Sequence, residues 1–227
     1  MSYFAIRNPF EDISPQMAQK AIREYNSGYF LSPSVPNVKL DQEGREKFRK
    51  ADLRNPHSLA DTLWWITTEY GGIMRRPPIF VETCCNLIAE NIMSSEGYID
   101  SLLDMPPLKD TLPDMDTITE IMRPFHALIP NESSYFAFTA ATKWLHFSRP
   151  DIFIPLDSRA RRFYRLPASN ANYNAKHYHA TLSIIRDVII GKIDKINLDA
   201  LKQADKFYMG DIKLLDKIAY TLGGRKK

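Results

Sequence analysis

Apolar residues recur at steps of three and four along most of the chain, which is the period of an α-helix. The most apolar stretch, 135–147, follows this period at Phe138, Ala141 and Leu145, and either Ser133 or Ser134 can cap its start. Similar stretches, bounded by caps, prolines and glycines, predict helices over 15–27, 41–53, 56–69, 79–93, 117–128, 175–190, 197–207 and 211–222. We find no convincing strand alternation, so we predict an all-α fold of about eight to ten helices.

The middle of the chain departs from this regular pattern. Lys143 interrupts the apolar stretch, and residues 148–156 hold Pro150 and Pro155, which predict an extended link. Asp157 comes next, placed to cap a short helix with a basic exposed face. A lysine on a buried helix, an aspartate at the next helix start and several arginines behind it form an unusual group. We interpret this group as the functional site.

Composition sets the broad class of the protein. The chain has 227 residues, of which 44% are hydrophobic, and this predicts one domain or two packed subdomains meeting at the proline-rich segment 105–113. No apolar run approaches the roughly 20 residues of a membrane span, and the N-terminus lacks the layout of a signal peptide. The two cysteines, Cys84 and Cys85, are adjacent and read as reduced thiols. We therefore expect a cytoplasmic protein without a membrane partner.

The site resembles a known family in two places. Ala141-Thr142-Lys143 resembles the end of the hairpin in the helix-hairpin-helix DNA glycosylase superfamily, where a catalytic lysine opens the second helix. Ile154-Pro155-Leu156-Asp157 resembles the apolar-Pro-apolar-Asp signature of that family, which carries its active-site aspartate. The nearest branch is the 8-oxoguanine glycosylase-like one. The resemblance implies a helical fold with two subdomains around a cleft, and a duplex DNA partner from which one base is flipped out.

The resemblance also implies roles for the two residues. Excising a base develops positive charge on the deoxyribose, and Asp157 would stabilise that charge; the plain alternative is that it only caps a helix. A buried amine loses its proton more readily, so Lys143 could attack the sugar and form a Schiff base. Alternatively, Lys143 reaches the surface or pairs with Asp157 or Asp151. Sequence alone leaves both questions open.

A glycosylase also needs a base pocket and phosphate contacts. Aromatic residues near Lys143 are candidates for the pocket, although each is individually more typical of core: Tyr135, Trp144, His146 and Phe147. Arginines in two clusters are candidates for the phosphates: Arg75, Arg76, Arg159, Arg161, Arg162 and Arg165. No ligand spacing for a metal and no nucleotide-binding glycine loop is present, so we predict no metal and no cofactor.

Two other functions remain open from the sequence. Segment 131–141 has no glycine where the family hairpin does, which favours a binding module that has lost the chemistry. A further alternative is an unrelated interaction protein in which Lys143 and Asp157 form a buried ion pair. For an enzyme, the substrate would be an oxidised purine or a hypermodified base in foreign DNA, which implies either repair or phage defence.

Overall fold

The computed structural model of the chain describes residues 8–28, 35–70, 78–126, 134–166, 175–193 and 195–224, without the side chains of 126 and 134–137. This part of the chain contains helices and no strand, so the all-α prediction is confirmed. The elements are η1 (Pro9–Asp12), α1 (Pro15–Ser27), α2 (Asn37–Lys50), α3 (Pro56–Thr68), α4 (Pro78–Ser94), α5 (Tyr98–Leu103), α6 (Met115–His126), α7 (Ser134–Ser148), α8 (Ser158–Phe163), α9 (Ala175–Ile189), α10 (Leu198–Ala204) and α11 (Asp211–Gly224). Within the described ranges, none of these helices is both long and apolar enough to cross a membrane.

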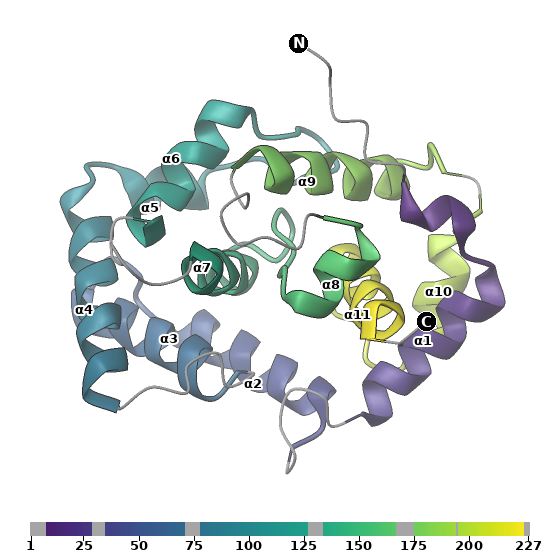
Figure 1. Cartoon of the computed structure of the whole chain (residues 1–227), viewed down its shortest axis with the longest axis horizontal. Helices are drawn as coiled ribbons and strands as arrows, with labels where there is room; N and C mark the ends of the chain where they lie inside the picture. The colour runs from purple at the N-terminus through teal and green to yellow at the C-terminus, as the bar shows by residue number, and fades with distance from the viewer. Residues whose placement is uncertain are drawn as a thin grey trace.

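Helices α7 and α11 lie in the middle of the molecule, and the other long helices form a ring around them (Figure 1). α7 packs against α2, α3 and α6, while α11 packs against α1, α8 and α9. Both central helices are therefore buried on most of their surface, including at positions that carry charge. This arrangement brings the middle of the sequence and its C-terminal end into one core.

Side-chain caps begin several helices where the sequence places them. Ser14 Oγ accepts the N–H of Met17 at the start of α1, and Asn55 Oδ1 accepts two N–H groups at the start of α3. Asn197, rather than Asp199, caps α10. Local hydrogen bonding therefore fixes the start of these helices.

Helix α2 differs from its prediction. It begins at Asn37 rather than near Asp41, and no side chain caps it. Asp41 is only 1% exposed, although the segment 41–53 is rich in charged residues. The first turn of α2 faces the centre of the ring, and this orientation comes from tertiary packing, which the local pattern does not encode.

The proline-rich segment 105–113 is tied to the end of α7. The Arg149 guanidinium donates hydrogen bonds to the carbonyls of Leu102, Leu103 and Met105 at 2.9, 2.6 and 2.6 Å. The Leu108 N–H donates to the Asp151 carbonyl at 3.1 Å. The segment is anchored to α7, and a division into two subdomains stays a prediction.

Candidate active site

A small cavity lies where the two central helices face α1 and the start of α8. Its walls are Tyr25, Tyr70, Lys143, Pro155, Asp157, Asp216 and Tyr220. Its volume is about 10 Å³, which is room for about one water molecule. The predicted lysine and the predicted aspartate therefore line one cavity, although they come from different segments.

Lys143 projects from the interior of α7 and is 4% exposed. Its Nζ donates to the Tyr70 carbonyl at 3.3 Å and lies 5.0 Å from the centre of the Tyr70 ring. Burial lowers the pKa of Lys143, against the opposing attraction of Asp157 and Asp216. Lys143 lies inside α7, which begins at Ser134, as the helix predicted over 135–147 places it; it does not open a helix as the lysine of the resembled family does.

Asp157 is half-buried and caps α8, as predicted. Its Oδ1 accepts the N–H groups of Arg159 and Ala160 at 2.8 and 2.9 Å. These bonds fix the carboxylate at the cavity edge. Among the described residues no ion pair joins Asp157 to Lys143, although both line the cavity.

The end of α11 positions α8, and therefore Asp157. A Cβ atom on Gly223 would lie 1.9 Å from the Arg159 carbonyl oxygen, so the two helices approach as closely as a glycine allows. The Gly223 carbonyl also accepts a hydrogen bond from Arg162 Nε at 2.8 Å. The geometry of the cavity therefore depends on this contact.

A buried charged network lies directly behind the cavity. Lys213 Nζ is 2.7 Å from Oδ2 of Asp216 and 2.8 Å from Oδ1 of Asp41. The hydroxyls of Tyr25 and Tyr70 donate to Asp41 at 2.8 and 2.7 Å. All five side chains are buried, and both tyrosines and Asp216 also form cavity walls.

The network perturbs its own acids and bases because two carboxylates share one ammonium. Burial, with smaller contributions from Asp41 and Asp157, raises the pKa of Asp216 to about 6 against the attraction of Lys213. Burial lowers the pKa of Lys213, but Asp216 and Asp41 outweigh it and leave that pKa raised. Such perturbed groups around a cavity are typical of functional sites.

Sequence reasoning missed Asp41, Lys213 and Asp216. One signal was available, because Lys213, Asp216 and Tyr220 follow helical spacing on a helix whose other positions are mostly apolar. A charged stripe on such a helix indicates burial against charged partners. Asp41 had no comparable signal in its own segment.

The predicted base pocket is corrected by the structure. Trp144 is 0% exposed and its Nε1 donates to Thr62 Oγ1 at 3.0 Å. His146 Nδ1 lies 2.8 Å from the Phe153 carbonyl, and Phe147 packs against other aromatic rings of the core. These three side chains are core residues and not pocket walls. The side chain of Tyr135 lies outside the described residues.

The arginines predicted to bind phosphates do not lie together on one surface. Arg162 and Arg165 are exposed and line a groove of about 640 Å³ between η1, α1, α8 and the end of α11. The Arg159 guanidinium stacks over the Tyr220 ring at 4.8 Å, and Arg161 is half-buried. Arg75 and Arg76 lie outside the described residues. DNA contact by any of them stays a prediction.

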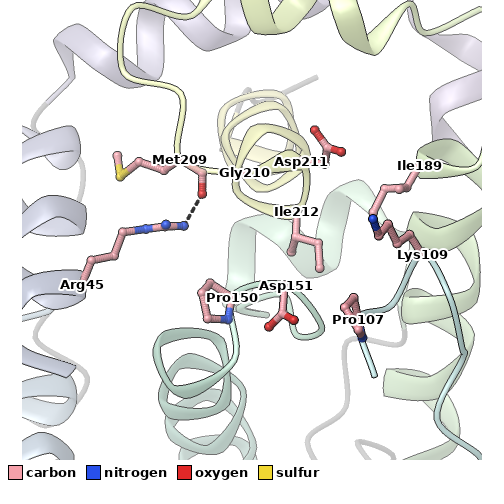
Figure 2. A pocket seen from close by; sticks show the side chains of 10 residues that line it. All are labelled: Arg45, Pro107, Lys109, Pro150, Asp151, Ile189, Met209, Gly210, Asp211 and Ile212. Carbon is pink, nitrogen blue, oxygen red and sulfur yellow. Dashed lines mark hydrogen bonds between the residues drawn. The ribbon is translucent and has the colours of Figure 1, made fainter. Parts of the chain in front are cut away.

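A second pocket, of about 400 Å³, lies at the other end of α11 (Figure 2). Arg45 reaches across it from α2 and donates to the Met209 carbonyl. Asp151 lines it and pairs with Arg149 at 2.9 Å, so the alternative in which Asp151 pairs with Lys143 is not what the structure shows. This pocket shares no wall residue with the Lys143 cavity.

In the described ranges, no three His, Cys, Asp or Glu side chains gather as metal ligands would. Comparison of the chain with protein-family models, with curated proteins and with solved structures finds no match.

Proposed function

We propose that this protein is a DNA glycosylase that excises a damaged or modified base, with the Lys143 cavity as its active site. One observation carries the proposal: Lys143 and Asp157 line the same cavity, and among the described residues no ion pair joins them. In a purely structural pair the amine and the carboxylate would be in direct contact. The arrangement suits a reaction in which one atom lies between a nucleophile and a carboxylate.

Asp157 suits the electrostatic part of the reaction. Cleavage of the N-glycosidic bond leaves positive charge on the deoxyribose, and a carboxylate next to that charge lowers the barrier. The two backbone N–H groups that bind Asp157 hold it in place before the reaction starts. Preorganisation of this kind gives the charge its effect.

Lys143 suits the covalent part. Its lowered pKa favours the neutral amine, whose lone pair is the nucleophile. Attack on C1′ of the sugar releases the base, and the resulting Schiff base leads on to strand cleavage. The hydrophobic surroundings of α7 supply the desolvation that this chemistry needs.

The volume of the cavity is too small for a nucleobase, so substrate binding must enlarge it. A nucleobase is larger than the space for one water, so its entry requires the tyrosine walls to move outward. In this proposal the exposed Arg162 and Arg165 of the groove beside α8 hold the phosphates, and Arg165 exchanges its ion pair with Asp12 for a phosphate. We therefore expect the enzyme to bind DNA first and to open the cavity afterwards.

The test is a panel of duplexes carrying oxidised, alkylated and hypermodified bases. Released base is identified by mass spectrometry, and abasic sites are detected by alkaline cleavage. Asp157→Asn should abolish release while leaving DNA binding intact, and Lys143→Gln should abolish covalent trapping by borohydride. Lys217→Gln is the matched control, since Lys217 is another buried lysine that pairs with Asp205 away from the cavity walls. Normal turnover by Asp157→Asn would refute the assignment.

A second candidate is a binding module of this fold without catalysis. The observation that favours it is the volume of the cavity, which admits no base in this conformation. The same panel separates the two, because a binding module would retain duplexes and release nothing from any of them.

A further inference from the structure

Asp216 has no role in the proposed function so far, yet it forms a wall of the same cavity. We infer that Asp216 is a second catalytic carboxylate, which takes a proton from Lys143 as its amine bonds to the sugar and passes that proton to the departing base. The inference rests on the proposed glycosylase function and adds the group that handles the proton.

The other carboxylates near the cavity are engaged in ways that exclude this role. Asp157 caps α8 through two backbone N–H groups, and the proposed function already assigns it to the charge on the sugar. Asp41 is not a cavity wall, and both of its oxygens accept hydrogen bonds, from the hydroxyls of Tyr25 and Tyr70. Asp216 alone among the three both lines the cavity and is fully buried, with Lys213 against its Oδ2.

The surroundings of Asp216 favour a carboxyl group that changes its proton easily. Titratable groups face it from the surrounding elements: Lys213 on α11, Tyr25 on α1, Asp41 on α2, Asp157 at the start of α8 and Lys143 on α7. Lys213 balances only one of the two carboxylates that it binds. The pKa of Asp216, raised to about 6 chiefly by burial, suits proton transfer near neutral pH.

The proposed step balances in atoms and electrons. The lone pair on Lys143 Nζ forms a bond to C1′, the C1′–N bond to the base breaks, and its electron pair leaves on the base. The secondary ammonium formed on Lys143 gives one proton to the Asp216 carboxylate. The carboxylic acid then gives that proton to the base, so Asp216 ends as it began and no co-reactant is required.

The test is the pH dependence of base release in single turnover, together with borohydride trapping on the same duplex. In the wild type, the rate should fall about tenfold per pH unit below about 6, where Asp216 is protonated. Asp216→Asn should slow release by about 10²- to 10⁴-fold and remove this inflection. Asp216→Glu should recover part of the rate and keep an inflection, which a merely structural role would not produce.

Asp205→Asn is the matched control. Asp205 is also buried and also pairs with a lysine of α11, Lys217 at 2.6 Å, but it is not a wall of the cavity. It should keep the inflection of the wild type. Two results would refute the role of Asp216 and leave the glycosylase function standing. One is an Asp216→Asn variant with the wild-type rate and pH profile; the other is a control variant that also loses the inflection.

Other outcomes concern different parts of the proposal. Absence of release from every duplex by the wild type refutes the glycosylase function, and the role of Asp216 with it. If Asp216→Asn does not fold, the wild-type profile and Asp216→Glu still decide the question, because a wild-type rate without an inflection near pH 6 contradicts the inference.

Discussion

Replacing Gly223 by alanine should disturb the candidate active site without touching Lys143, Asp157 or Asp216. The new Cβ atom would lie 1.9 Å from the Arg159 carbonyl oxygen and 2.8 Å from its carbon, and both atoms belong to the backbone of α8. Cβ atoms in proteins essentially never approach another heavy atom of this kind to below 3.0 Å, so α8 must move by at least about 1 Å. Asp157 caps α8 and moves with it.

The size of the effect follows from this displacement. Overpacking of this kind costs about 1–3 kcal/mol, and the better helix propensity of alanine offsets up to about 1 kcal/mol of it. In a chain of this length, each kcal/mol lowers the melting temperature by about 2–4 °C. A misplacement of about 1 Å costs about 10²-fold in rate, so base release should suffer more than stability.

The assay compares Gly223→Ala with Gly224→Ala by urea unfolding and by base release. A Cβ atom on Gly224 meets only the flexible Arg159 side chain, at 3.0 Å from its Nη1 and 3.2 Å from its Cδ, which can shift at little cost. Gly224→Ala should therefore behave as the wild type. Equal stability and equal rates for the two variants would show that the α8–α11 contact does not position Asp157.

Three further predictions concern charge. Asp157→Ala should lower the free energy of unfolding by about 0.5–2 kcal/mol because it removes the cap of α8. Asp157→Asn keeps the cap and loses only the charge, so equal free energies of unfolding for the two variants would contradict the capping role. Because the pKa of Asp216 is about 6 in the folded protein and 3.8 by itself, its contribution to stability is present at low pH and is lost as the pH rises from about 4 to about 6. Urea unfolding across that range should show this decline in the wild type relative to Asp216→Asn, and a constant difference would refute it. The logarithm of DNA affinity should fall linearly with that of salt concentration, and Arg162→Gln with Arg165→Gln should reduce the slope by about 2 if each binds a phosphate. An unchanged slope would place the phosphates elsewhere.

The helix starts were predictable because their causes are local. Ser14, Asn55 and Asp157 each bind N–H groups two or three residues along the chain, and the sequence shows both partners together. Where no side chain provides a cap, as at α2, the predicted start is wrong by several residues. Local chemistry therefore explains much of the secondary structure and little of the packing.

The candidate site could be predicted only in part for a related reason. Asp157 and Lys143 stand out because each interrupts an apolar pattern. Asp41 stands out only beside Lys213, which lies far along the chain and meets it through the packing of α11 inside the ring. Trp144 shows the reverse error, since a helical stripe of aromatic residues looks the same whether it lines a pocket or fills a core.

The buried network itself argues for function, because stability alone does not explain it. Burying two carboxylates and an ammonium costs desolvation energy that their mutual attraction only partly offsets. Replacing such buried charges by well-packed apolar residues often leaves the free energy of unfolding unchanged or raises it by about 1–4 kcal/mol. We therefore expect a variant with Asp41→Leu, Lys213→Met and Asp216→Leu to fold at least as stably as the wild type, provided that Tyr25→Phe and Tyr70→Phe remove the hydroxyls left without partners.

Lys213→Met alone should lower the free energy of unfolding by about 3–5 kcal/mol, because it leaves two buried carboxylates without their cation. Urea unfolding measures both variants, and base release shows what the network provides. If the variant with all five substitutions is stable and inactive, the charged residues serve the chemistry. If that variant unfolds, the network holds the central helices together, and Asp216 is a structural residue.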